Sequence, residues 1–307
     1  MILIADLGAT NARFCMTDDG TSYFHQAKYP INNFDSLEDL LSLYFSEHKV
    51  TNPQKAVIGV AAPITEDSIS FINIDLEFSK QKLKKNFFPK GLIVVNDLEL
   101  QAHALLDLDQ RHLSYIGELR AKSGPKILIS PGTGLGLAGI IGDKVISTEA
   151  GHINISTAIT NDNLAVIINE FMIKEGRAPT YEDFLSGKGI SRFYTFFSND
   201  KKLKLTNEEI LAKRNDSSAL QAINLLNYLL ASYLRYVTLV WGATGGVFLS
   251  GSIVNSLLLT EDYQNFRDVF ESSDTMRIVL ESAPIAIVRD EEIGFLGGME
   301  IAKKLLN

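Results

Sequence analysis

Residues 2–17 read ILIADLGATNARFCMT, and this stretch decides the fold class. Its apolar start, Ile2–Ala5, is typical of a buried strand, Gly8–Asn11 has the composition of a turn, and Ala12–Met16 predicts a second strand. A turn at Asp18–Gly20 then precedes a third strand, Ser22–Ala27. Because no helix follows the first turn, the pattern predicts an antiparallel meander.

The same pattern returns in the middle of the chain. Strands are predicted at Lys126–Ser130, Leu137–Ile141 and Val145–Thr148, with turns at Pro131–Gly134 and Gly142–Asp143. Gly8 and Gly132 hold the same place in the two copies, offset by 132 − 8 = 124 residues. We interpret this as a duplicated meander, one copy in each of two lobes.

Further strands and several helices fill the rest of the chain. The strands are predicted at Ala56–Ala61 and Leu92–Val95, and the helices within Phe34–His48, at Ser79–Asn86 and Leu98–Leu105, at 162–175, 180–197, 206–213 and 217–240, and after Gly294. The alternation predicts an α/β protein.

The composition excludes several classes of protein. A chain of 307 residues buries a sizeable core, and its one cysteine, Cys15, forms neither a disulfide framework nor a Cys-based zinc site. With 29 basic and 37 acidic residues the net charge is −8, which argues against binding to nucleic acid or to anionic membranes. We expect a cytoplasmic protein that acts on small molecules.

One uncharged segment, Tyr236–Thr260, is long enough to cross a membrane. Glycines at four positions and polar residues between them divide it into short pieces. This favours the order helix, turn, buried strand, turn. The N-terminus, MILIADLGAT, has no basic region and is not typical of a signal peptide.

The two Gly/Thr turns are candidate phosphate-binding sites, because a turn of this kind exposes several backbone amides in one concavity. A competing pattern, GLGLAG at residues 134–139, fits the dinucleotide fingerprint, but a hairpin and not a helix follows it. The chain has neither a GxxxxGK[ST] loop nor the HRD and DFG sequences of protein kinases.

Polar residues follow two of the predicted strands. Asn96 and Asp97 stand directly after an apolar strand, where a carboxylate could deprotonate a substrate hydroxyl or could merely cap the next helix. Glu149 and His152 end the second meander, where they suit polyol recognition or simply occupy a turn. The other histidines form no ligand pair with His152, so a His-based metal site is not expected.

Taken together, these residues resemble the bacterial ATP-dependent glucokinases of the hexokinase/actin-like superfamily. Seven motifs occur in order: Asp6–Arg13 (DLGATNAR), Ala62–Thr65 (APIT), Asn96–Asp97, Gly132–Gly136 (GTGLG), Glu149–His152 (EAGH), Leu185–Gly187 (LSG) and Gly245–Gly251 (GGVFLSG). The likeness extends to Gly294–Gly298, which is nearly the whole chain. Single motifs of this kind are weak, whereas seven in order are specific.

The resemblance implies a role for each matching position. Asp97 is implied as the catalytic base and as a sugar ligand, and Asp6 as the holder of Mg²⁺, through water. The other implied sugar ligands are Asn96, Glu149, His152 and Glu182. The implied nucleotide ligands are Gly8, Thr10 and Asn11 in the first turn, Gly132, Thr133 and Gly134 in the second, and Gly246, Ser250 and Gly251 at the adenine.

Four positions depart from the family pattern. They are Ala9, Ala150, Leu76 (after Asn73) and Pro131 (after Ser130). These departures bear on nucleotide affinity and sugar preference more than on the class of reaction. Related ROK sugar kinases usually carry a Cys-rich zinc motif, which one cysteine cannot form, so the resemblance favours the zinc-free glucokinase group.

The resemblance implies a two-lobed actin-like/ribonuclease H-like ATPase fold of class α/β, with mixed sheets and flanking helices in each lobe. The small lobe would hold residues 1–106, completed by a C-terminal helix at 293–307, and the large lobe residues 107–292. The implied activity is transfer of the ATP γ-phosphoryl group to the 6-hydroxyl of glucose, with ATP and Mg²⁺, by a homodimer. The alternatives are a kinase for another hexose or amino sugar, a non-catalytic sugar sensor, and an actin-like filament ATPase.

Overall fold

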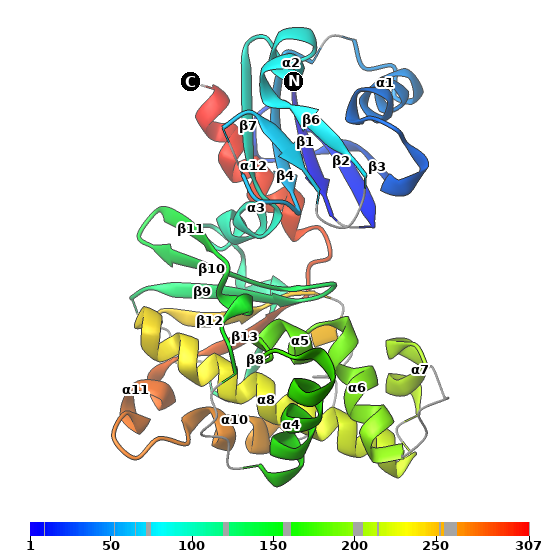
Figure 1. The fold of residues 1–307 in the computed structure, drawn as a ribbon. Coiled ribbons are helices and arrows are strands. Elements are labelled where there is room, and N and C mark those ends of the chain that lie inside the picture. The colour runs from blue at the N-terminus through cyan, green and yellow to red at the C-terminus, as the bar shows by residue number, and fades with distance from the viewer. Residues whose placement is uncertain are drawn as a thin grey trace. The chain divides into compact units, whose positions relative to one another are not determined.

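The computed structural model describes residues 1–8, 10–51, 53–64, 66–71, 75–118, 123–155, 161–198, 205–213, 215–251, 253–254 and 263–306. The chain divides into two compact units (Figure 1). Unit 1 comprises residues 1–112, 145–147 and 290–307, and unit 2 comprises residues 113–144 and 148–289. The lobe boundaries at 106/107 and 292/293 stay predictions.

Unit 1 is built on a five-stranded sheet with the order β3-β2-β1-β4-β7. The strands are β1 (Ile2–Leu7), β2 (Asn11–Thr17), β3 (Phe24–Pro30), β4 (Lys55–Val60) and β7 (Gly91–Asn96). The first three pair antiparallel, which confirms the predicted meander. β4 and β7 continue the sheet parallel to β1. A short hairpin of β5 (Ser68–Ser70) and β6 (Glu77–Ser79) lies outside this sheet.

Helices cover the sheet of unit 1. They are α1 (Leu37–Glu47), α2 (Lys80–Asn86), α3 (Asp97–Ala104) and α12 (Ile293–Leu306). α1 begins at Ser36, whose side chain accepts a hydrogen bond from the Asp39 amide, and its apolar face packs with Leu3 and Phe14 in one core cluster. α3 and α12 pack with Ile2 and Val57 in another.

Glycines allow the C-terminal helix α12 to lie close to β1 and α3. A Cβ at Gly297 would overlap the carbonyl oxygen of Leu100, and one at Gly298 would overlap the side chain of Ile4. A Cβ at Gly294 would lie 2.6 Å from a carboxylate oxygen of Asp6. The last helix therefore closes against the strand that carries Asp6.

Unit 2 is built on a six-stranded sheet with the order β11-β10-β9-β12-β13-β8, of which only the middle of β11, residues 145–147, is assigned to unit 1. The strands are β8 (Leu113–Ile116), β9 (Lys126–Pro131), β10 (Leu135–Ile141), β11 (Lys144–Thr148), β12 (Gly246–Leu249) and β13 (Ile285–Val288). β9 and β10 form an antiparallel hairpin. This is the second meander that the sequence predicts.

The two sheets repeat one another closely. Adding 124 to the bounds of β1 (2–7) and β2 (11–17) gives 126–131 and 135–141, which are the bounds of β9 and β10. In each unit two parallel strands follow, β4 and β7 beside β1, and β12 and β13 beside β9. The duplication therefore covers five strands, two more than the sequence pattern shows, and β8 is an addition at the edge of the second sheet.

The helices of unit 2 pack into one large core cluster with its sheet. They are α4 (Asp162–Glu175), α5 (Tyr181–Leu185), α6 (Gly187–Ser198), α7 (Asn207–Ala212), α8 (Ser217–Trp241), α10 (Tyr263–Glu271) and α11 (Arg277–Ser282). The single helix predicted at 180–197 is wrong, because extended backbone at Ser186 (φ −105°, ψ −177°) separates α5 from α6.

The uncharged segment that starts at Tyr236 has the predicted order as far as the structure describes it. α8 ends at Trp241, Gly242 takes a left-handed conformation, and β12 follows as a buried strand. Part of its last third, at residue 252 and from 255 onward, lies outside the described residues. No helix in the described ranges is long and apolar enough to span a bilayer.

Candidate functional site

In unit 1 the candidate residues gather at one edge of the sheet. The register pairs Leu7 with Val60 and Val60 with Asn96, so the parallel strands β1, β4 and β7 end side by side. Asp6, one residue before the end of β1, and Asp97, one residue after the end of β7, therefore reach the same carboxyl edge. Ligands of open α/β sheets bind at this edge.

The first turn, residues 8–11, joins β1 to β2 at that edge. The Gly8 amide donates to the carbonyl of Asn11 at 3.0 Å, and the Ile31 amide donates to the carbonyl of Thr10 at 3.0 Å. Thr10 is exposed. Ala9, one of the departures from the family pattern, lies outside the described residues.

Asn96 caps helix α3, and Asp97 still lies at the carboxyl edge of the sheet. The Asn96 side-chain oxygen caps α3 by accepting hydrogen bonds from the amides of Leu98 (3.0 Å) and Glu99 (3.4 Å). Asp97 is the first residue of α3, and its Oδ1 lies 2.9 Å from the Leu98 amide. The carboxylate thus sits where the helix dipole favours negative charge.

Asp6 lies in an electrostatically unusual place. The pKa of its carboxyl is raised to about 7, chiefly by desolvation and also by the nearby Asp97 and Glu292 carboxylates, while the charge of Arg13 opposes the rise. Arg13 is directly opposite Asp6 in the β1–β2 pair, and its guanidinium donates to the carbonyl of Glu291 at 2.8 Å. A cation near Asp6 would relieve this concentration of negative charge.

The second turn, residues 132–134, joins β9 to β10 in unit 2. Its Gly132 amide donates to the Gly134 carbonyl, and its Gly132 carbonyl accepts from the Gly187 amide, both at 2.8 Å. Nothing lies within 4 Å of a Cβ built on Gly132, and its φ is not in the left-handed region. Neither crowding nor backbone conformation in the described chain requires glycine there, so the space that a side chain would fill is open to a ligand.

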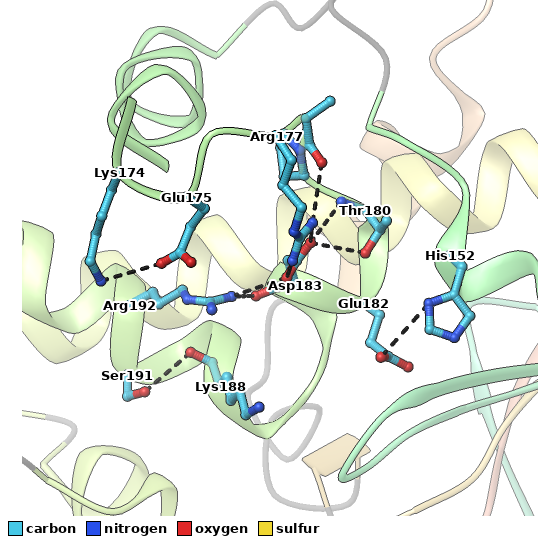
Figure 2. Close-up of polar contacts among 12 residues, drawn as sticks. His152, Lys174, Glu175, Arg177, Thr180, Glu182, Asp183, Lys188, Ser191 and Arg192 are labelled. Carbon is cyan, nitrogen blue, oxygen red and sulfur yellow. Dashed lines mark hydrogen bonds and ion pairs between the residues drawn. The ribbon is translucent and has the colours of Figure 1, made fainter. Parts of the chain in front are cut away.

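Glu149, His152 and Glu182 lie together in unit 2. His152 Nε2 is 3.8 Å from Glu149 Oε2, and His152 Nδ1 is 4.0 Å from Glu182 Oε1 (Figure 2 shows the second pair). The side chains of Glu149 and His152 are 73% and 58% exposed, whereas that of Glu182 is 32% exposed. Glu182 also accepts a hydrogen bond from the Leu135 amide at 2.8 Å, which ties it to the second turn.

Sequence reasoning missed the ion-pair cluster that holds α5 beside this group. Arg177 donates to both carboxylate oxygens of Asp183 at 2.8 Å, and Arg192 contacts Asp183 from α6 (Figure 2). Thr180 and Asp183 form a capping box. Burial opposes ionisation of Asp183, but the hydrogen bonds from Arg177 and Thr180 outweigh it and lower its pKa to about 2. The T-x-x-D spacing is the sequence signal that could have found this cap.

The residues expected at the adenine do not come together at one end of β12. The Ser250 amide donates to the Ile129 carbonyl at 3.0 Å, and a Cβ at Gly251 would lie 2.9 Å from the Pro131 carbonyl oxygen, so both adjoin the second turn. Gly246 begins β12 and pairs with Lys126, at the far end of the same strand. At about 3.3 Å per residue, β12 separates Gly246 from Ser250 by about 13 Å.

Three departures from the family pattern occupy packed positions. Leu76 is 5% exposed in the core of unit 1. Pro131 is the buried last residue of β9 and pairs with Leu135. Ala150 packs against the core of unit 2. Packing against apolar neighbours explains why these three residues are apolar. It gives no evidence that any of them contacts a ligand.

Comparison with known proteins finds relatives similar to this chain in sequence and in fold. A curated glucokinase of Neisseria gonorrhoeae is 29% identical over 306 residues, covering 96% of this chain and 92% of that protein. A glucokinase solved from an Antarctic psychrotroph superimposes with a TM-score of 0.82 at 26% identity, covering 98% of both chains. A glucokinase from Balamuthia mandrillaris in complex with glucose gives 0.82 at 18% identity, covering 98% of this chain and 93% of that one.

These likenesses show the α/β actin-like fold, and the sequence match decides the family. The family model described as Glucokinase matches residues 3–305, almost the full length of the chain. The chain belongs to the Glucokinase family.

Proposed function

We propose that this chain is a glucokinase that transfers the γ-phosphoryl group of ATP to the 6-hydroxyl of glucose. The observation that carries the proposal is the carboxyl edge of the unit 1 sheet, where Asp97 begins a helix beside Asp6 and the first turn. Family membership and the repeated turn of unit 2 support it.

We assign the binding of sugar hydroxyls to residues of unit 1 and, separately, to residues of unit 2. In unit 1, the side-chain oxygen of Asn96 is engaged in capping, so its amide nitrogen is the group that would donate to a sugar oxygen. In unit 2, the carboxylates of Glu149 and Glu182 would accept hydrogen bonds from sugar hydroxyls, and His152 lies between them. Carboxylates that accept from hydroxyls suit a polyol.

Phosphate binding is assigned to the two turns, through Gly8, Thr10 and Asn11 in unit 1 and Gly132, Thr133 and Gly134 in unit 2. Within the described part of the chain, neither the Thr133 nor the Gly134 amide has a hydrogen-bond partner. Backbone amides of this kind bind anionic oxygens, and the Thr133 hydroxyl adds another donor. Ser250 and Gly251 adjoin this turn and are proposed for the nucleoside side, whereas Gly246 is left out because of its place at the far end of β12.

Asp6 fits a magnesium ion held through water and phosphate oxygens. Its carboxyl faces the charges of Asp97 and Glu292, which a cation would offset. Across the described residues, no group of three or more His, Cys, Asp or Glu side chains is arranged to hold a metal, so a cage made of protein ligands is not proposed. Mg²⁺ commonly takes one or two carboxylates and leaves the other positions to water and phosphate. When bound, it would neutralise charge on the transferring phosphoryl group.

Asp97 is proposed as the general base. Its carboxylate would accept the proton of the 6-hydroxyl as that oxygen bonds to the γ-phosphorus and the bond from phosphorus to the ADP oxygen breaks. Phosphoryl transfer needs little covalent help, so orientation of the hydroxyl is the larger part of this role.

The test is a coupled assay of ADP release over a panel of hexoses and amino sugars, with and without Mg²⁺. We expect glucose to give the highest kcat/KM and Asp97→Ala to lower kcat by about 100-fold while sugar binding remains. Near-normal turnover of Asp97→Ala would remove Asp97 from the role of base. A higher kcat/KM for another sugar would reassign the acceptor, and no turnover with any sugar would refute the kinase.

We also propose a homodimer that acts in the cytoplasm. Exposed apolar side chains of α8, Tyr236 (44%), Leu239 (38%) and Val240 (66%), offer a surface for a second copy. Analytical ultracentrifugation at micromolar concentration tests the dimer, and a single species at the mass of one chain would refute it. Cell fractionation of the native host tests the location.

A further inference from the structure

We propose that Glu182 positions the second turn as well as facing the sugar cluster, so that nucleotide affinity depends on a carboxylate assigned to the sugar. The inference rests on the proposed function, because it takes residues 132–134 as the phosphate turn. It assigns to Glu182 a positioning role that acts through the backbone of that turn.

The first observation is that the two carboxylate oxygens of Glu182 have different neighbours. Oε2 accepts a hydrogen bond from the Leu135 amide at 2.8 Å, at the residue that follows the turn. Oε1 lies 4.0 Å from His152 Nδ1, within the group formed with Glu149. One side chain of α5 therefore reaches both the turn and the sugar cluster, across 47 residues of sequence.

The second observation is that Gly134 is shaped to receive this carboxylate. A Cβ at Gly134 would lie 2.6 Å from Glu182 Oε2 and 3.4 Å from its Cδ. The φ of Gly134 is not in the left-handed region, so it is the carboxylate, and not the backbone conformation, that a side chain at this position would displace in the described chain. By contrast, Gly132 has no neighbour within 4 Å of its Cβ position. The two glycines of the turn thus serve different purposes.

The third observation is that α5 is a firm support. Asp183, the residue after Glu182, is held by Arg177, Arg192 and the Thr180 cap (Figure 2). Just beyond α5, the Gly187 amide donates to the Gly132 carbonyl at 2.8 Å. The segment 182–187 therefore holds the turn at both of its ends, at Gly132 through the backbone and at Leu135 through the Glu182 carboxylate.

Loss of this carboxylate has two opposing effects on a bound nucleotide. Removing a negative charge close to phosphates would strengthen binding, whereas releasing the Leu135 amide would loosen the turn and weaken binding. A hydrogen bond to a charged group contributes about 1.5–3 kcal/mol, roughly a 10- to 150-fold change in an equilibrium constant. Part of that is recovered by water at a site that is 32% exposed, so we expect about a 10-fold loss of affinity in Glu182→Ala.

Glutamine at position 182 separates the two effects. It keeps an oxygen that accepts from the Leu135 amide, and it removes the charge. Glu182→Gln should therefore bind nucleotide within about threefold of the wild type, while its sugar KM rises with that of Glu182→Ala. Glu149→Ala is the matched control, because Glu149 belongs to the same cluster and its ion pair is with His152.

The experiment is calorimetric titration of each folded variant with AMPPNP and Mg²⁺ in the absence of sugar, with circular dichroism as the check on folding. We expect weaker AMPPNP binding in Glu182→Ala only, with Glu182→Gln and Glu149→Ala close to the wild type. An AMPPNP affinity of Glu182→Ala within twofold of the wild type would overturn the proposal. So would equal losses in Glu182→Ala and Glu182→Gln, or in Glu182→Ala and Glu149→Ala.

A second variant covers the case in which Glu182→Ala does not fold. Gly134→Ala places a methyl group where the carboxylate lies, so it should weaken AMPPNP binding in the wild type. The effect should be smaller in a Glu182→Gln background, where the hydrogen bond that the methyl group disturbs is to a neutral oxygen and is weaker. Equal effects in both backgrounds would count against the coupling. All of these AMPPNP affinities are measured without sugar, so they do not depend on kinase activity. A protein that phosphorylates no hexose but shows these affinities would refute the proposed function and would still support the positioning role of Glu182.

Discussion

His103 should make unit 1 sensitive to acid. This residue lies in the last turn of α3 and is only 5% exposed. Desolvation, with a smaller contribution from the charge of Lys304, lowers the pKa of its imidazole from 6.5 to about 4. A positive charge near the C-terminal end of a helix is normally favoured, so burial outweighs the helix dipole here.

The sign and size of the effect follow from linkage. The folded pKa lies below the unfolded value, so the unfolded chain binds a proton first as the pH falls. The contribution of neutral His103 is fully present above pH 6.5 and is lost between pH 6.5 and 4. A shift of 6.5 − 4 = 2.5 units, at 1.36 kcal/mol each, is about 3 kcal/mol of unfolding free energy.

Asp6 has the opposite effect in the same pH range, because its pKa is raised to about 7 and its protonation favours the folded state as the pH falls. The wild-type curve therefore combines two opposing slopes, and the difference from a His103→Gln variant isolates one of them. We would measure urea unfolding by far-ultraviolet circular dichroism at steps from pH 7 to pH 4, with EDTA present. Relative to the wild type, His103→Gln should gain about 3 kcal/mol between these limits. Parallel curves for the two proteins would refute the assignment.

Three further substitutions test separate parts of the molecule. Gly132→Ala should leave the melting temperature within about 2 °C of the wild type but raise the KM for ATP about 10-fold, because its methyl group enters space open to a ligand; a normal KM would remove Gly132 from the nucleotide site. Glu149→Ala should raise the KM for glucose and leave kcat nearly unchanged, since the contact is shared by ground and transition states; an unchanged KM would contradict its role. Gly297→Ala should destabilise unit 1 by about 3 kcal/mol or more in urea unfolding, because its methyl group overlaps the Leu100 carbonyl; a loss below about 0.5 kcal/mol would show that α12 moves aside easily.

The parts of the fold that sequence could predict are those in which a local pattern repeats. The turns at Gly8 and Gly132 stand out because both follow an apolar run, and their offset of 124 residues locates the hairpins. The parallel strands β7 and β13 share no pattern that marks them as equivalent. Their correspondence comes from pairing with strands far away in the chain, which a window of sequence does not contain.

The sequence indicates which types of residue form the candidate site, but it only partly predicts where these residues lie in the fold. The pair Asn96–Asp97 could be interpreted as a cap or as a functional site, and the structure shows the cap without excluding the edge position. The hydrogen bond from Leu135 to Glu182 joins residues 47 positions apart, which local sequence does not reveal, and the apolar spacing of residues 180–197 conceals the break at Ser186 because it continues across it. Gly246 was grouped with Gly251 because both belong to one motif, although a strand between them places them at opposite ends.

The first and second turns join strands of equal length, but different hydrogen bonds hold the two turns in place. The first turn is held by its own backbone, from Gly8 to Asn11, and by the start of the segment after β3 at Ile31. The second has its own backbone hydrogen bond, from the Gly132 amide to the Gly134 carbonyl, and is also held from outside by the Glu182 carboxylate and the Gly187 amide. In the described chain, only the support of the second turn includes a charged side chain, so the second turn responds to whatever contacts that side chain. Because Glu182 Oε1 also lies 4.0 Å from His152 Nδ1, in the cluster proposed to bind the sugar, we predict that sugar binding alters the geometry of the second turn.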